Sequence, residues 1–287
     1  MGYLLILLRT LIYSSGNMMR KNYVRGTAGL RSSTDIYMLV AHLFASVFLF
    51  ALAKGSVPLN LTIFLFAAIY AAVCGASAFV STVAYKTVNY FYVSIFSGAG
   101  GLLVPFAYEL CTGVTFGMGK ILSVLFRVAA ILIPLLFQKE KIGGIGLCIM
   151  LFFTSGVGTV VMGIFSASSV ADQSASMFFW TNLFILPVVL VQLLRKYKVA
   201  DLVADMKKVK PRHYLYIMAP TAINNVASLL TVLILQMVSA TISTVISSCC
   251  SIVLAAFLSV VVYKEKMTLQ AKISMVLTML SAIVGVL

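Results

Sequence analysis

The sequence predicts an all-α membrane protein with ten transmembrane helices arranged as two inverted five-helix repeats. Composition, the lengths of the apolar segments and a weak internal similarity lead to this prediction. Of the 287 residues, 62% are hydrophobic and only 10% are charged. Soluble domains carry roughly 45–50% apolar and about 25% charged residues. Because so few polar groups cannot cover a water-exposed surface, we expect lipid to surround most of the chain.

Ten apolar segments have the length of a membrane span, for which about 20 residues are needed. They are continuous rather than alternating, which favours helices over a transmembrane barrel. The first is interrupted by Arg9 and is predicted to be a retained span, because no basic segment precedes it and no cleavage pattern follows it. The expected spans are 2–19, 36–53, 60–84, 88–108, 118–137, 142–165, 176–194, 213–236, 239–263 and 267–287.

The spans divide into two halves, 1–141 and 142–287, which together form one transmembrane domain. The longest polar connection, 195–213, contains apolar residues at helical spacing. It is interpreted either as an amphipathic helix at the membrane surface or as a solvated basic loop.

An internal similarity supports the division into halves. With a shift of 156 residues, five identities align, and each block is an apolar span that ends in Glu followed three residues later by Thr. An odd number of spans per half would place these two glutamates on opposite faces of the membrane, as in an inverted repeat. The aligned pairs are Ala99 with Ala255, Leu102 with Leu258, Val104 with Val260, Glu109 with Glu265 and Thr112 with Thr268.

These blocks resemble the ten-span branch of the drug/metabolite transporter superfamily, the EamA-type carriers. The similarity is strongest over 239–287, where a span rich in small residues ends in Glu265 and a Gly-containing last span follows; 90–133 matches less well. The proline usual early in the ninth span is absent. The resemblance implies a carrier whose cavity is lined by spans one, three, four, six, eight and nine.

The positive charges indicate an orientation. The net charge is +14, and the basic residues lie in short clusters between apolar segments, which argues for topology signals rather than nucleic-acid binding. One face receives only Lys54 and Lys120, so the other face is predicted to be cytoplasmic and the termini outside, whereas the resemblance implies termini inside. The second face carries Arg20, Lys21, Arg25, Arg31, Lys86, Lys139, Lys141, Arg195, Lys196, Lys198, Lys207, Lys208, Lys210, Arg212, Lys264, Lys266 and Lys272.

Polar residues inside spans are the candidates for a binding site, because they are costly in a bilayer. Tyr70, Cys74 and Ser77 share one face of the third span. No Asp or Glu lies deep in a predicted span. Arg9 and Arg127 are interpreted either as snorkelling side chains, with Glu109 as a neighbour for Arg127, or as anion-binding groups. The residues expected to bind substrate are Arg9, Tyr13, Asn17, Tyr70, Asn224 and Asn225.

These features predict a secondary carrier that moves a small metabolite, amino-acid-like or another small polar solute, by alternating access in a cell membrane of the bacterial inner-membrane type. The alternative is a flippase or carrier for a phosphate-bearing lipid or an anionic metabolite such as a nucleotide sugar. His42 is interpreted as a structural residue or, less simply, as a proton carrier. The histidines and cysteines form no catalytic or zinc-binding motif, so neither an enzyme nor a metal or cofactor is expected. The oligomeric state, with a homodimer as one option, stays open.

Overall fold

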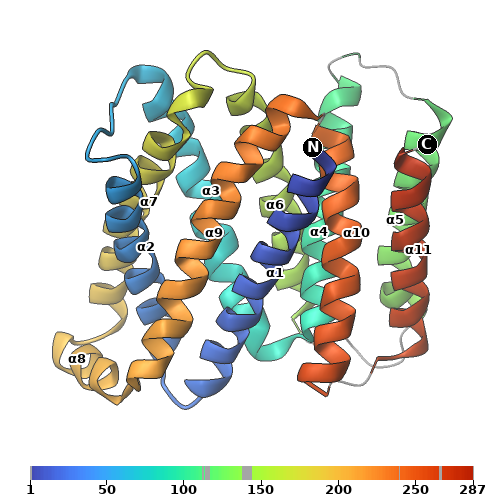
Figure 1. Ribbon diagram of the computed structural model, residues 1–287. Helices are drawn as coiled ribbons and strands as arrows, with labels where there is room; N and C mark the ends of the chain where they lie inside the picture. Colours follow the sequence, from blue (N-terminus) through green and yellow to red (C-terminus); the bar gives the residue numbers. More distant parts are fainter. Residues whose placement is uncertain are drawn as a thin grey trace.

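Each of the ten apolar segments forms one long α-helix in the computed structural model (Figure 1). The structure describes residues 2–111, 113, 117–137, 144–238, 240–264 and 267–286, and none of these is in a β-strand. Thr112 and Glu265 of the internal similarity lie outside the described residues, as do Lys139, Lys141 and Lys266 of the basic face.

The helices follow one another with short connections. The first helix continues to Gly26, seven residues beyond the predicted end of the first span. The bounds are α1 Gly2–Gly26, α2 Ser33–Leu52, α3 Leu61–Thr87, α4 Tyr90–Cys111, α5 Met118–Phe137, α6 Ile145–Ser166, α7 Ser174–Lys196, α8 Val199–Lys208, α9 Pro211–Met237, α10 Ala240–Phe257 and α11 Leu269–Val286, with a π-helical turn at Leu258–Val262 and a 3₁₀ turn at Ala171–Gln173.

Local signals fix several helix ends. Asn60 precedes α3, and its side-chain oxygen accepts a hydrogen bond of 2.8 Å from the backbone N–H of Ile63, which satisfies one of the free donors of the first turn. Pro211 is the first residue of α9, where its missing N–H costs nothing.

Seven of the described helical segments are long and apolar enough to cross a membrane. Large apolar side chains point outward from them; Leu61, Val188 and Phe153 are 74%, 65% and 57% exposed. An outer surface of this kind is stable in lipid and not in water. The chain is therefore a multi-pass membrane protein. The seven segments are Ser33–Leu52, Leu61–Thr87, Tyr90–Cys111, Ile145–Ser166, Ala171–Lys196, Pro211–Met237 and Ser243–Val262.

Helices from the two halves of the chain pack against each other throughout the bundle. The first half contacts the second through α1 with α9, α4 with α6, α3 with α6, α2 with α7 and α4 with α10. A further pair, α5 with α11, stands at one edge of the bundle, on the right in Figure 1. The halves are thus interleaved rather than separate domains.

Helices α4 and α6 approach each other closely, and this approach depends on glycine. A Cβ atom added at Gly100 would overlap the backbone carbonyl of Phe152, and one at Gly156 would overlap Val104. Small residues let helix backbones approach closely in membranes, where packing rather than the hydrophobic effect holds helices together.

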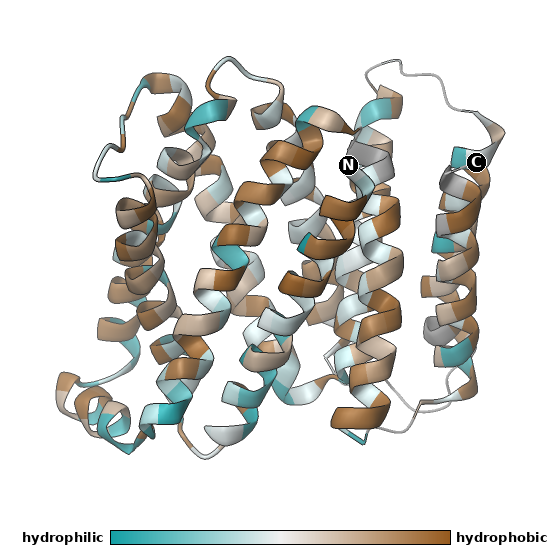
Figure 2. Ribbon diagram, viewed as in Figure 1, coloured by the Kyte–Doolittle hydropathy of each residue, from teal (hydrophilic) through white to brown (hydrophobic). Residues whose placement is uncertain are grey.

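The short helix α8 lies at the end of the bundle where the basic residues gather, in the segment for which the sequence left a helix and a loop open. Figure 2 shows hydrophilic residues on α8 and on the neighbouring ends of α1 and α9, and hydrophobic residues over the middle of the bundle. The Ser32 hydroxyl donates a hydrogen bond of 2.7 Å to Asp205 of α8. This bond lowers the pKa of Asp205 and fixes α8 to the start of α2.

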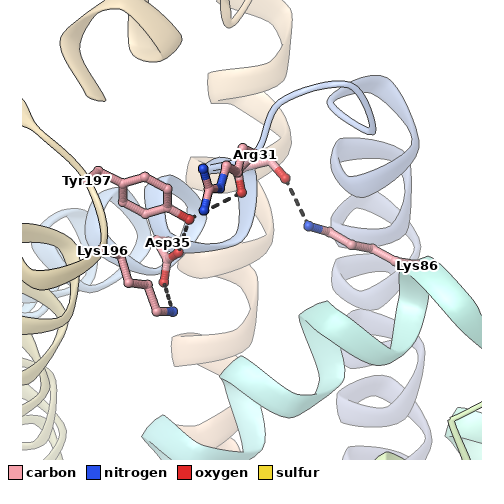
Figure 3. Close-up of polar contacts among 6 residues, drawn as sticks. Arg31, Asp35, Lys86, Lys196 and Tyr197 are labelled. Atoms are coloured by element: carbon pink, nitrogen blue, oxygen red, sulfur yellow. Dashed lines mark hydrogen bonds and ion pairs between the residues drawn. The ribbon is translucent and has the colours of Figure 1, made fainter. Parts of the chain in front are cut away.

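A polar cluster at the same end joins α2, α3 and α7 (Figure 3). Asp35, only 5% exposed, accepts a 2.9 Å hydrogen bond from the Tyr197 hydroxyl and lies 3.4 Å from Lys196 Nζ. Burial, together with the bond to Asp35, raises the pKa of Tyr197 to about 12, so the phenol stays protonated and donates. Lys86 at the end of α3 donates to the Ser33 hydroxyl at 3.0 Å.

Gly100→Ala should destabilise the protein by on the order of 1–3 kcal/mol or more, because the added methyl group meets a backbone atom that cannot move without shifting a helix. The matched control is Gly98→Ala, where the nearest side-chain atom would lie 3.5 Å from the new Cβ. Thermal unfolding of both purified variants tests this. Equal melting temperatures would contradict the proposed close α4–α6 contact.

Asp35→Ala should cost about 1 kcal/mol more stability than Asp35→Asn. Asparagine keeps an acceptor for Tyr197 and loses only the ion pair with Lys196, whose side chain is 41% exposed and contributes little. Alanine removes both. Melting temperatures of the two variants measure the difference, and equal losses in the two variants would show that the ion pair with Lys196 dominates.

Candidate functional site

A central cavity of about 240 Å³ lies between six helices, α1, α3, α4, α6, α9 and α10. These are the six helices that the resemblance to EamA-type carriers implies for the cavity. Three belong to the first half of the chain and three to the second. The lining includes Tyr85 near the C-terminal end of α3 and Leu235 near the C-terminal end of α9. These two helix ends lie at opposite ends of the bundle, so the cavity extends along much of its length.

One face of α3 lines the cavity over four turns. Tyr70, Cys74 and Ser77, which the spacing in the sequence places together, all border it. Ser81 and Tyr85 continue the same face toward the basic end of the bundle. The periodicity of the helix thus determines the polar wall that this span contributes.

The opposite wall comes from α10, and the sequence analysis missed it. Ser243, Thr244, Ser247, Ser248 and Ser251 all line the cavity. Their spacing of three and four residues was the available signal, since residues at this spacing share one face of a helix.

Many of the hydroxyl groups around the cavity are already hydrogen-bonded to protein. Ser155 donates to the carbonyl of Ser97 at 2.8 Å, which joins α6 to α4. Ser248 donates to the carbonyl of Gly98 at 3.1 Å, which joins α10 to α4. A hydroxyl oxygen that donates its proton still has lone pairs with which it can accept. The hydroxyl-bearing serines and threonines at the cavity are Ser14, Ser77, Ser81, Ser94, Ser97, Thr154, Ser155, Thr159, Ser228, Thr231, Ser243, Thr244, Ser247, Ser248 and Ser251.

The charge of the cavity is positive. Arg9 and Arg20 line it, and no Asp or Glu is among the described residues that do. The sequence analysis assigned Arg20 to a basic loop, which is wrong because α1 continues past it and turns it inward. Its guanidinium donates hydrogen bonds of 2.9 Å to the Tyr37 hydroxyl and to the Ser81 hydroxyl.

Four of the six residues expected to bind substrate lie together at the cavity: Arg9, Tyr13, Asn17 and Tyr70. Asn224 and Asn225 are on α9 but are not among the residues that line it. The Asn225 amide donates to the carbonyl of Thr221 at 2.8 Å. Asn224 packs against α1, where a Cβ added at Gly16 would lie 2.5 Å from its Oδ1 atom. Neither asparagine therefore borders the cavity, where ligand contact was predicted.

Arg127 lies on α5, away from the cavity lining, and its side chain is fully buried. None of its three guanidinium nitrogens has a hydrogen-bond partner in the described part of the chain, so neither snorkelling nor the pairing with Glu109 is observed. Neighbouring polar groups of the α5–α11 seam include Ser123, which lies 3.1 Å from the Ser281 hydroxyl.

His42 is a buried residue of the α2–α7 contact. Its Nδ1 atom lies 2.7 Å from Oδ1 of Asn182, whose amide in turn donates to the carbonyl of Phe178 at 2.8 Å. Trp180 donates to the carbonyl of Val57 at 3.3 Å. Because none of these side chains lines the cavity, the structural interpretation of His42 fits its position.

An aromatic layer lies at the basic end of the cavity. Tyr85 stacks on Tyr90 with ring centroids 5.6 Å apart, and Tyr90 packs on Tyr263 at 5.8 Å. The ammonium of Lys21, a residue only 2% exposed, lies 4.4 Å from the Tyr263 ring centroid. The Tyr263 hydroxyl donates to the carbonyl of Met18 at 3.0 Å. Rings from α3, α4 and the end of α10 therefore meet α1 at this end.

Comparisons with known proteins support the fold and go no further. No protein-family model and no curated protein matches the sequence. A crystal structure of a protein matches with a TM-score of 0.65 at 14% sequence identity, over 96% of this chain and 95% of its own. At that identity the match shows a shared fold alone. The class that the fold and cavity define is an all-helical, multi-pass membrane protein with a polar central cavity.

Asn182→Ala should destabilise the protein by about 1–3 kcal/mol, because it leaves the buried His42 ring without its hydrogen-bond partner. The double variant His42→Leu with Asn182→Leu, which removes both polar groups, should recover part of the loss. Thermal unfolding of the single and double variants tests this. A single variant as stable as the wild type would show that the contact contributes nothing.

Proposed function

We propose that this protein is a secondary carrier that moves a small polar solute by alternating access between two inverted five-helix halves. In this proposal α1, α5 and α11 also cross the membrane, which gives ten spans, and the chain belongs with the EamA-type carriers. The observation that carries the proposal is a single polar cavity to which both halves contribute three helices each.

The pattern of helix contacts supports a repeat. Suppose that α1, α2, α3, α4 and α5 correspond to α6, α7, α9, α10 and α11. Exchange of the halves then turns the α1–α9 contact into α6–α3, the α4–α6 contact into α10–α1 and the α2–α9 contact into α7–α3, and all of these contacts occur. The α2–α7, α4–α10 and α5–α11 contacts map onto themselves. The three lining helices of each half correspond in the same way.

This correspondence gives alternating access a physical basis. In carriers built from inverted repeats, each half can adopt the conformation of the other, which closes one end of the cavity and opens the opposite end. In this proposal the tyrosine layer of Tyr85, Tyr90 and Tyr263 would part when the cavity opens at the basic end.

The proposed location is a cell membrane, with the basic end of the bundle in the cytoplasm. The ends of α3 and α7 and the start of α9 carry lysines and arginines and lie at the same end of the bundle as α8. An excess of Lys and Arg in short connections sets cytoplasmic orientation. Both termini would then face the outside, since both lie toward the other end of the bundle (Figure 1).

Natural cysteines offer a test of alternating access that needs no knowledge of the solute. Cys74 lines the cavity, whereas Cys111 is exposed at the end of α4. A variant that keeps only Cys74, the other four cysteines being alanine, should react with a membrane-impermeant methanethiosulfonate added to either side of sealed vesicles. The matched variant that keeps only Cys111 should react from one side.

Labelling of Cys74 from one side alone, under all conditions, would reject alternating access and leave a one-sided receptor cavity. Labelling from both sides with ion conductance in planar bilayers would favour a channel instead. Solute flux without conductance is the result that the proposal predicts.

A further inference from the structure

We propose, building on the carrier function above, that the solute bears an oxyanion, either a carboxylate or a phosphate ester, and that Arg9 is the residue that binds it. Three observations favour an oxyanion among the polar solutes that such a cavity could accept. They are the unpartnered Nε atom of Arg9, the hydrogen bonds that hold Arg20, and the lack of acidic residues among the described residues of the lining.

Arg9 is a cation at the cavity with a donor that the described residues leave unused. Its Nε atom is buried and has no partner in the described part of the chain, and no ion pair with an acidic residue is present there. The guanidinium carbon lies 5.7 Å from the centroid of the Tyr13 ring. A ring packed over one face of a guanidinium leaves the N–H groups at its edge free to bind a planar carboxylate or a phosphate in a bidentate manner.

A half-buried cation without a counter-charge is costly in a membrane protein. Arg9 lies only a few turns from the start of α1, so its side chain could extend toward the membrane surface instead. The structure places it in the cavity. Binding of an anion would supply the missing partner, and the pairing would be strong because it is shielded from water.

Arg20, unlike Arg9, donates hydrogen bonds to other side chains of the protein. Its hydrogen bonds to Tyr37 and Ser81 hold it against α2 and α3. Eleven residues of helix separate the Cα atoms of the two arginines by about 16 Å along the axis. Arg20 therefore extends the positive potential toward the basic end of the cavity, and Arg9 provides the free donors.

The rest of the lining disfavours an amino-acid-like zwitterion. A free ammonium group is bound most strongly by a carboxylate, and none is among the described residues at the cavity. Serine, threonine and tyrosine hydroxyls instead surround the space on α3, α6 and α10. Hydroxyls both donate and accept, so they suit the hydroxyl and phosphoryl oxygens of an organic acid or a sugar phosphate.

Matched pairs of compounds test whether the solute bears an oxyanion. The melting temperature of the detergent-purified full-length protein is measured with each compound, because a ligand that binds the folded state raises it. The pairs are glucose 6-phosphate with glucose, succinate with succinamide, and dioctanoyl phosphatidic acid with dioctanoylglycerol; inorganic phosphate and L-alanine complete the set. In at least one pair the oxyanion should stabilise the protein and its neutral partner should not.

Arg9→Gln should weaken the apparent affinity for that oxyanion about tenfold or more, and Arg9→Lys should retain part of it, since lysine keeps the charge and loses the bidentate geometry. The matched control is Arg195→Gln, an equal change of charge at an exposed position at the end of α7, which should bind as the wild type does. The preference of the wild type within each pair tests the class even if an Arg9 variant fails to fold.

Stabilisation by glucose, succinamide or alanine alone would overturn the inference, as would Arg9→Gln binding an oxyanion as tightly as the wild type. No shift with any oxyanion would also reject it. Two-sided labelling of Cys74 would leave the carrier function standing in each of these cases. A rise in melting temperature with phosphatidic acid alone would support an oxyanion-bearing ligand and identify its phosphate as a lipid headgroup.

Discussion

The structure depends on one constraint: in lipid, every backbone N–H and C=O must find its partner within the protein. The described residues meet it with helices, and the connections that have other conformations are confined to the two ends of the bundle. Once the backbone is satisfied within each helix, the side chains of each helix are free to face either lipid or the interior. The large exposed apolar residues, such as Leu61 and Val188, face outward.

The cavity can be polar because its serine and threonine side chains find hydrogen-bond partners within their own helices. Serine and threonine side chains can bond to the carbonyl four residues back in their own helix, as Thr159 does with Ser155 and Thr231 with Ala227. They therefore enter a bilayer at low cost and still present an oxygen to the cavity. Glycine has a different role at the α4–α6 contact, where Gly100 lets α4 lie directly against the backbone of α6. A polar cavity can thus form among helices whose outer surfaces are apolar.

Acidic and basic residues occupy different parts of the bundle. Acidic residues in the described chain lie at helix ends, where Asp35 and Asp205 join α2, α7 and α8 at the basic end. The cavity has arginines and no described acid, so its potential is positive along its length. Positive charge without a counter-ion is costly in a low-dielectric bundle, and that cost is the physical basis for the proposed anionic solute. Tyrosine rings at the basic end lie between this potential and the cytoplasm in the proposed orientation.

The sequence by itself determined the helices, because hydrophobic length and continuity leave no other structure in lipid. It also determined which residues share a helix face, as with Tyr70, Cys74 and Ser77, since that depends only on the helical repeat. Only the tertiary structure decided which neighbour each face meets. The rotation and length of α1 bring Arg20 inside, and the rotation of α9 turns Asn224 toward Gly16 and away from the cavity. These choices arise from packing between segments far apart in the chain, about which the spacing of residues within one helix carries no information.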